Sequence, residues 1–414
     1  MTRNSRQVPS GPVNAEPREL LSKPGTNIEG AGEHNRRVVM HVLRVNGSMS
    51  RAQIARGTGL APQTVSNIMD ELEHDGFVVA AKPVKGGRGQ PAIPYSLAAD
   101  GAFAFGIQID QHRARVAAVD LLGNVVARAE TALGPGGLQG NLALILSTIG
   151  TVSAQLRAVV APASPYIIGL GLAMPAPSGV HAVQDDPWMV GLTPTHPMVE
   201  ALQNATGLTV SLHHDASAAA MAERLNGQVA GLDDFVLIFV SYGIGAGIYA
   251  RGEVYRGHHR LAGELGLVSM QGNDGPEPLE RRAGLGYLYA ALNLSPSQPD
   301  LFDRLEHAVN NNHPVVTDWL TIASRHLAWA IDLIECLIDP GCVVIGGQMP
   351  KVLMARLMTA INLALPTLPS GEQTLRPRLL EGSSDAFSVA VGAAADPIAR
   401  AFDPSFSAIM KSLP

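Results

Sequence analysis

The segment from Ser50 to Leu72 constrains the fold most, because its residues have the spacing of two short helices that cross at a tight turn. Ser50 and Gln53 have the capping-box spacing, in which each side chain bonds the backbone amide of the other. Gly59 suits a turn with positive φ, and Pro62 suits the first position of the next helix. The pattern predicts a helix-turn-helix, whose second helix enters the major groove of DNA.

Apolar spacing indicates which faces of these helices point inward. A preceding helix places Val38, Val42 and Val45 on one face and ends at Asn46. In the second helix of the motif four apolar side chains face inward, and four short polar side chains are left to reach base edges and phosphates. The inward set is Val65, Ile68, Met69 and Leu72, and the outward set is Gln63, Thr64, Ser66 and Asn67.

A predicted hairpin from Gly76 to Leu97 follows the second helix, and its tip is basic and glycine-rich. Such a hairpin completes a winged helix-turn-helix. We expect Arg88 at the tip and Arg51 in the motif to contact the DNA backbone or the minor groove. A three-helix bundle that binds another protein is the alternative interpretation of the same pattern.

Charge is distributed unevenly along the chain. The net charge is −6, but residues 34–98 carry eight Lys and Arg against four acids, and residues 99–414 carry a net charge of −10. A basic head on an acidic body is what a separate DNA-binding module would produce. We therefore divide the chain into a flexible tail (1–31), a DNA-binding head (32–98) and a body (99–414).

The cellular compartment is inferred from three features that the sequence lacks: a cysteine framework, a signal peptide and an uninterrupted membrane span. The two cysteines, Cys336 and Cys342, supply neither a disulfide framework nor a four-cysteine zinc site. The N-terminus has no apolar signal-peptide core, and the apolar run from Leu327 to Ile338 is interrupted by Asp332 and Glu335. We expect a cytoplasmic protein with no membrane partner.

The body alternates apolar strands with helices from Phe103 onward, which indicates an α/β fold. Glycine-rich turns fall at expected strand ends, where such folds hold ligands. Four of these segments in one α/β unit suggest two lobes that close on a ligand. They begin at Gly106, Gly169, Gly243 and Gly346.

From about His34 to near the C-terminus the chain resembles the ROK family, which comprises repressors, open reading frames and kinases. The resemblance implies a two-lobed actin-like ATPase fold in the body and assembly as a homodimer or homotetramer. Its motifs are Ser50-Arg51-Ala52, Thr58-Gly59-Leu60, Gly86-Gly87-Arg88-Gly89-Gln90-Pro91, His214-Asp215-Ala216, Gly243-Ile244-Gly245-Ala246-Gly247, Ala262-Gly263-Glu264-Leu265-Gly266 and Val344-Ile345-Gly346-Gly347.

The resemblance also implies a sugar site. Asp215 matches the family's sugar-binding carboxylate, which is the general base in the kinases, and Glu264 matches a second sugar ligand. Glu280 matches a further acid near the pocket. Carboxylates suit this role because each accepts hydrogen bonds from vicinal hydroxyls. The alternative for each residue is a surface acid or a helix cap.

The chain departs from the kinases at both phosphate-binding turns. The kinases have a glycine-rich turn near the start of the domain, where this chain has Gln108, Asp110 and Gln111. At the second turn Ser241-Tyr242 replaces a Gly-Thr pair. Side chains thus fill loops that must approach phosphate closely, and Asp110 adds negative charge. We expect no catalytic residues and no kinase activity.

Two further departures concern metal and sugar. The family's structural zinc uses a His where this chain has Leu267, followed by a Cys cluster that is absent here. We expect no metal and no cofactor, because His213-His214 and His258-His259 are neighbouring pairs that would point apart on a strand. Trp188 stands near the family's sugar contact and is expected either to stack on a sugar or to lie in the core.

These observations predict a DNA-binding transcription regulator of carbohydrate genes whose effector is a sugar or sugar phosphate. A dimer would hold two heads over a two-fold operator on double-stranded DNA, and residues 92–104 would transmit closure of the lobes. Release of repression by sugar is the expected sign. One alternative is a bifunctional sugar kinase with a DNA-binding head, and another is a constitutive DNA-binding protein whose body only dimerises.

Overall fold

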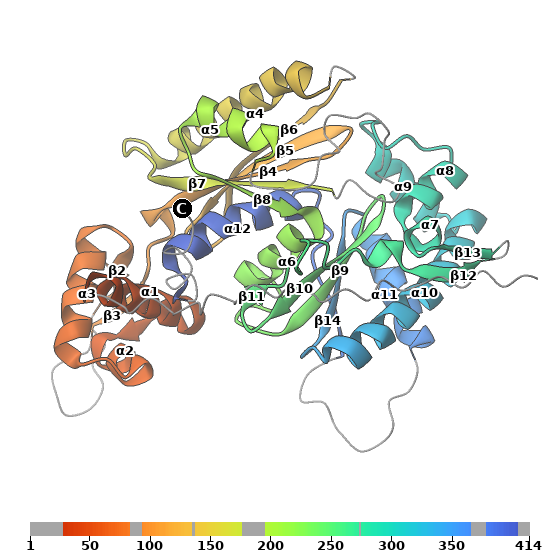
Figure 1. Ribbon diagram of the computed structural model, residues 1–414. Coiled ribbons are helices and arrows are strands. Elements are labelled where there is room, and N and C mark those ends of the chain that lie inside the picture. The colour runs from red at the N-terminus through yellow and green to blue at the C-terminus, as the bar shows by residue number, and fades with distance from the viewer. Residues whose placement is uncertain are drawn as a thin grey trace, which may run out of the picture.

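The computed structural model describes residues 28–82, 93–134, 137–175, 195–272, 275–365 and 378–404. They form an N-terminal head and a body with two lobes, each built on a five-stranded sheet. In Figure 1 the head lies at one end of the body, beside the C-terminal end of α12. This arrangement is the winged helix and two-lobed α/β fold expected from the sequence.

The head contains three helices and a small antiparallel sheet with the strand order β1-β3-β2. The first helix begins at Ile28, a few residues before the predicted end of the tail at residue 31. The elements are α1 (Ile28–Asn46), β1 (Met49–Ser50), α2 (Arg51–Thr58), α3 (Pro62–His74), β2 (Val78–Ala80) and β3 (Pro94–Leu97).

The buried face of α1 differs from the predicted one. Val39, Met40 and Leu43 are buried in the core of the head, whereas Val45 is 55% exposed. Because residues 37–45 are mostly apolar or long-stemmed, helical spacing alone did not select the face. The selection comes from packing, since this core is continuous with residues of α12 such as Ile398.

The first lobe has the strand order β6-β5-β4-β7-β8, with an antiparallel half and a parallel half. Helices α4 and α5 cover one face and α12 covers the other (Figure 1). The elements are β4 (Phe103–Ile109), β5 (Arg113–Asp120), β6 (Val125–Ala132), α4 (Gly137–Val160), β7 (Ile167–Met174), α5 (Pro197–Thr206), β8 (Val210–His214) and α12 (Ser388–Phe402).

The second lobe has the strand order β11-β10-β9-β14-β15. Helix α6 packs on β9 and β10, whereas α7, α8 and α11 pack on the long α10 and α9 packs on α11. The elements are α6 (Asp215–Asn226), β9 (Phe235–Val240), β10 (Ile244–Ala250), β11 (Glu253–Val254), β12 (Ser269–Gly272), β13 (Gly275–Pro278), α7 (Glu280–Ala283), α8 (Leu285–Ala291), α9 (Leu301–Asn310), α10 (Pro314–Ile338), β14 (Val343–Gly347), α11 (Lys351–Ala364) and β15 (Leu379–Glu381).

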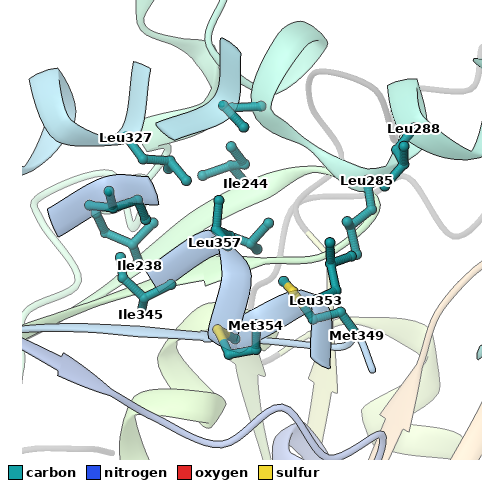
Figure 2. Packing of buried hydrophobic residues seen from close by; sticks show 14 of the residues in the cluster. Ile238, Ile244, Leu285, Leu288, Leu327, Ile345, Met349, Leu353, Met354 and Leu357 are labelled. Carbon is teal, nitrogen blue, oxygen red and sulfur yellow. The ribbon is translucent and has the colours of Figure 1, made fainter. Parts of the chain in front are cut away.

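The core of the second lobe lies between its sheet and the helices α10 and α11. Figure 2 shows Ile238 and Ile345 of the sheet facing Leu357 of α11, with Leu327 of α10 nearby. On the same helix Trp319 is fully buried and donates a hydrogen bond to the carbonyl of Gly284 at 3.3 Å. The apolar run from Leu327 to Ile338 lies in α10, with Leu327 and Ile331 in this core and Leu337 exposed.

Helices α6 and α12 meet at backbone distance. A Cβ added to Gly392 of α12 would lie 1.6 Å from the carbonyl oxygen of Ala218 in α6. A Cβ at Gly171 of β7 would lie 1.8 Å from the carbonyl oxygen of Ala393. The absence of side chains here allows α12 to lie against both the first sheet and α6, so that these elements form one tightly packed block.

The head docks directly on this block. Phe77 makes edge-on contacts with Phe402 of α12 at 5.2 Å and with Tyr166 of the first lobe at 6.2 Å between ring centroids. Ala98 and Ala102 are also buried, so the segment expected to act as a linker is part of the packed core where the structure describes it. The head and first lobe therefore share apolar surface in addition to a covalent connection.

One helix in the described ranges is long and apolar enough to cross a membrane, namely the part of α4 from Gly140 to Val160. Core helices of soluble proteins meet the same criteria of length and composition, and α4 packs on β5 and β6 of the first sheet. The match is therefore weak evidence for a membrane span.

Candidate functional site

A pocket lies where the carboxyl end of β8 faces the start of β10. Asp215 is the first residue of α6, immediately after β8, and Glu264 immediately precedes the short 3-10 helix η3 (Leu265–Leu267). Glu280 begins α7. The structure thus brings all three predicted sugar ligands to the wall of one pocket, which also includes Ser241 and Gly243 of the β9–β10 turn.

Asp215 combines a fixed carboxylate with an unusual acidity. Its Oδ1 accepts a hydrogen bond from the backbone amide of Ala216 at 2.8 Å. Burial raises the pKa of this carboxyl to about 7, and the negative charges of Glu264 and Asp110 act in the same direction. At neutral pH the group is therefore divided between a form that donates and a form that only accepts hydrogen bonds.

Glu264 is paired with a neighbouring histidine that sequence reasoning did not select. His214 Nδ1 lies 3.6 Å from Glu264 Oε1. Burial lowers the pKa of His214 to about 4, so the imidazole is neutral at physiological pH. His214 lines the pocket beside Asp215, and its position directly before that residue was the available signal.

Glu280 has a structural contact as well as a place in the pocket. It is buried, and its Oε2 accepts a hydrogen bond from the backbone amide of Ile244 at 3.4 Å. A Cβ at Gly266 would lie 2.7 Å from the same oxygen. Glu280 therefore holds the β9–β10 turn against η3 while it lines the pocket.

The first phosphate turn is closed by its own side chains. Asp110 Oδ1 accepts the backbone amides of His112 and Arg113 at 2.7 and 2.8 Å, and its Oδ2 lies 3.2 Å from Arg115. The negative charge expected to repel phosphate is thus paired with Arg115, which corrects that part of the argument. The turn is nevertheless closed, because these amides are already bonded.

Gln108 occupies the same region from the strand side. It is buried, and its Oε1 accepts a hydrogen bond from Nε2 of Gln348 at 2.7 Å. Gln348 follows β14 and also bonds the carbonyl of Ala386, so the pair connects the first sheet to the second. At the second turn Tyr242 lies 6.4 Å from Tyr289, ring to ring, where a small hydroxyl was expected in a kinase.

Among the described residues no group of three His, Cys, Asp or Glu side chains could hold a metal ion. The two predicted histidine pairs behave differently. On β8, His213 faces Asp396 of α12 at 3.4 Å while His214 faces Glu264 at 3.6 Å, so the two rings diverge as expected. His258 and His259 lie in a turn, edge to face at 4.6 Å.

The recognition face of the head has the predicted construction. Ser50 Oγ accepts the Gln53 amide at 3.4 Å, the Ser50 amide donates to Gln53 Oε1 at 2.9 Å, and Gly59 has a φ of 71°. On α3, Gln63 and Asn67 are exposed and hydrogen-bonded to each other at 2.9 Å. Thr64 and Ser66 are half-buried on the adjoining surface, and the predicted inward residues are buried.

Arg51 has contacts within the head that sequence reasoning missed. Its guanidinium donates to Ser66 Oγ at 2.8 Å and to Asp70 at 2.6 Å, and it lies over the ring of Tyr95 at 5.1 Å. This side chain joins α2, α3 and β3, so its predicted contact with DNA competes with a structural role. Arg88 and Trp188 lie outside the described residues.

The chain thus joins a winged helix-turn-helix head to a two-lobed domain with a carboxylate-lined pocket. This combination is the architecture of a DNA-binding regulator with a ligand-binding domain. A family model described as the ROK family matches residues 104–395, and a model described as winged helix-turn-helix DNA-binding matches residues 33–79. The chain belongs to the ROK family.

The chain is similar to three known proteins. It is 26% identical over 368 residues to the DNA-binding transcriptional dual regulator NagC of Escherichia coli K12, a match that covers 81% of this chain and 86% of the relative. The crystal structure of a ROK family transcriptional regulator, a homologue of the E. coli MLC protein, superposes with a TM-score of 0.65 at 23% identity, covering 92% of this chain and 99% of that one. A ROK family glucokinase from Streptomyces griseus, in complex with glucose and AMPPNP, gives a TM-score of 0.53 at 20% identity, covering 71% and 98%.

Proposed function

We propose that this protein is a sequence-specific transcription repressor of carbohydrate genes and that a sugar effector releases it from DNA. One observation carries the proposal: Asp215, Glu264 and Glu280 line one pocket, while the turn at Asp110 is closed by its own side chains, in a chain with a winged helix head. The similarity to NagC, which is a DNA-binding transcriptional regulator, supports it. The protein would act in the cytoplasm as a homodimer or homotetramer, with no membrane partner, cofactor or catalytic residue.

Recognition of an operator would use α3. Gln63 and Asn67 are exposed, and their amides can donate to and accept from base edges in the major groove. Thr64 and Ser66 would add contacts to bases or phosphates, and Arg51 and Arg88 would contact the backbone or the minor groove. Two heads on a symmetric dimer would read a two-fold operator.

Helix α6 offers a short route from pocket to head. It begins at Asp215 and carries Arg224 in its last turn, where the guanidinium lies 3.4 Å from Asp403 at the end of α12 and 3.3 Å from Asp233. His41 and Arg44 of α1 lie within the field of this group, and burial lowers the pKa of Arg44 to about 10. A sugar that binds the two lobe arrangements with different affinity would thereby shift the position of the head.

Gel-shift titration with the DNA upstream of the protein's own gene tests the proposal. We expect wild-type protein to bind that DNA and one sugar, but not its epimers, to release it. Asn67→Ala should weaken operator binding about tenfold, because loss of a base contact costs about 1–3 kcal/mol. Asn204→Ala, an exposed asparagine on α5, is the matched control and should have no effect. Operator binding that no sugar changes would refute the sensor, and absence of binding at modest salt would refute the whole proposal.

A bifunctional sugar kinase is the second candidate, and the acidity of Asp215 favours it. A carboxyl with a pKa of about 7 is well matched to general-base work at neutral pH. The filled turns at Gln108, Asp110 and Tyr242 oppose ATP binding. A coupled assay with ATP, magnesium and a panel of hexoses separates the candidates, since ADP release above the no-sugar rate would establish the kinase.

A further inference from the structure

A second, shallow pocket adjoins the sugar pocket. The two share His214 and Ala262 in their walls, so they lie on either side of one histidine. Arg256 and Arg260 come from the loop after β11, and Ser217 comes from the first turn of α6. A ligand that passes His214 would therefore contact both pockets at once.

The two pockets have opposite charge. The lining of the sugar pocket includes Asp215, Glu264 and Glu280 but no Lys or Arg, whereas the lining of the second pocket includes Arg256 and Arg260 but no Asp or Glu. Both statements refer to the described parts of the chain. A neutral sugar would use only the acidic half of this combined surface.

Arg256 is held in place rather than mobile. Its Nη1 donates to the carbonyl of Leu212 at 3.4 Å, and its Nη2 lies 3.1 Å from His213 Nδ1. The guanidinium is half-buried, and burial lowers its pKa. A cation that is partly removed from water is stabilised by an anion that enters beside it.

Asp396 is the carboxylate whose charge acts on Arg256, and it already has other partners. Asp396 lies behind His213 at 3.4 Å and accepts a hydrogen bond from Arg400 at 2.6 Å. Within the described ranges no carboxylate lies in ion-pair distance of Arg256 or Arg260, and Arg260 is exposed at the pocket rim. Arg256, Arg260 and Ser217 therefore line the second pocket, and the charge of Asp396 acts on Arg256 from outside that lining.

We propose that the second pocket binds the anionic group of the effector, so that the effector is a sugar carrying a phosphate or a carboxylate. This inference rests on the proposed function and narrows it. Hydroxyl groups would bind the carboxylates of the first pocket, and the anionic group would accept charge-assisted hydrogen bonds from Arg256 and Arg260 and a hydrogen bond from Ser217.

Calorimetry on the full chain tests this inference with sets of sugars that share one ring. Each set contains the neutral sugar, its 6-phosphate and its uronate, for example glucose, glucose 6-phosphate and glucuronate. We expect one anionic member to bind at least tenfold more tightly than its neutral parent, and the phosphate and uronate arms identify which anion is preferred. Arg260→Gln should reduce that advantage about tenfold, which corresponds to about 1.4 kcal/mol. Arg304→Gln, an exposed arginine on α9, should leave it unchanged.

The outcomes separate this inference from the proposed function. If a neutral sugar binds most tightly and Arg260→Gln binds it like wild type, the anionic pocket is refuted while sugar sensing stands. If the anionic preference persists in Arg260→Gln, its assignment to this pocket is refuted. If no member of any set binds, the proposed function fails together with the inference.

Discussion

Two neighbouring regions of the body differ in whether their polar groups are already bonded. The sugar side is the pocket lined by Asp215, Glu264 and Glu280, and the phosphate side is the turn at Asp110 together with Gln108. On the sugar side Asp215, Glu264 and Glu280 line an open pocket. On the phosphate side Asp110 bonds the amides of its own turn, and Gln108 is bonded to Gln348 across the lobes. Asp215 and Asp110 lie on different loops, so the turn at Asp110 can be closed by its own side chains while the pocket keeps its carboxylates.

The carboxyl groups of Asp215 and Asp110 differ in the same way, because only that of Asp110 is paired with a cation. Burial and two neighbouring acids raise the pKa of Asp215 to about 7, a state that a ligand's hydroxyl groups can relieve. The carboxylate of Asp110 instead lies 3.2 Å from Arg115 and is already compensated. The sugar side is therefore prepared for a ligand, whereas the phosphate side is satisfied without one.

The largest predicted effect is on the sugar side. Asp215→Asn removes a carboxylate acceptor without changing volume, and we expect sugar affinity to fall about 100-fold, since hydrogen bonds to charged groups contribute about 1.5–3 kcal/mol. Calorimetry measures the affinity, and gel shift should show unchanged operator binding without sugar. Asp303→Asn, an exposed acid on α9, is the control. Wild-type affinity in Asp215→Asn would show that the sugar does not use this pocket.

The next effect is a pH dependence of sugar affinity. Because the pKa of Asp215 is about 7, the ionised fraction rises about tenfold between pH 6 and pH 8, and affinity should rise with it if the carboxylate accepts the sugar's hydroxyl protons. Titrations at half-unit steps give the midpoint. A flat profile in wild type, or the same slope in Asp215→Asn, would contradict this role.

A smaller effect is expected from the bridge on the phosphate side. Gln348→Ala removes hydrogen bonds to Gln108 and to Ala386, which are 2.7 and 2.9 Å long, and thereby loosens the contact between the lobes. If sugar binds best with the lobes together, affinity should fall about threefold, less than the full value of one hydrogen bond of about 1 kcal/mol. Gln203→Ala, exposed on α5, is the control. Tighter binding would mean that the bridge opposes the sugar-bound arrangement.

The smallest effect concerns stability without ligand. The folded-state pKa of Asp215 lies above the ordinary value of 3.8, so the folded chain retains a proton that the unfolded chain has lost, and stability falls as pH rises from about 4 to 7. Asp215→Asn cannot ionise and should unfold about 2 °C higher than wild type at pH 8, with the gap closing toward pH 5. Differential scanning fluorimetry measures both. A gap that does not change with pH would have another cause.

Local rules predicted the head well. The capping box at Ser50, the turn at Gly59 and the inward face of α3 depend on residues a few positions apart, and all were confirmed. The buried face of α1 was missed because the packing that selects it involves α12, more than 350 residues away. The contacts of Arg51 were missed because Tyr95 lies 44 residues further along the chain.

The site could be predicted only where a motif marked it. Asp215 and Glu264 lie in motifs that resemble the family's, and the structure brings them into one pocket. Arg256 and Arg260 belong to no such motif, and only the folded chain shows that their loop lies beside His214. The hydrogen bond between Gln108 and Gln348 could not be predicted from the sequence either, since the two residues are 240 positions apart.

The bridge between Gln108 and Gln348 also determines what quantity such a protein can measure. A kinase consumes its sugar, so its occupancy reflects the rate at which substrate arrives and product leaves. Under the proposed function the domain releases its ligand unchanged, and its occupancy depends only on free concentration and affinity. Gene output controlled in this way follows the size of the effector pool, costs no ATP per reading and reverses as soon as the pool is depleted.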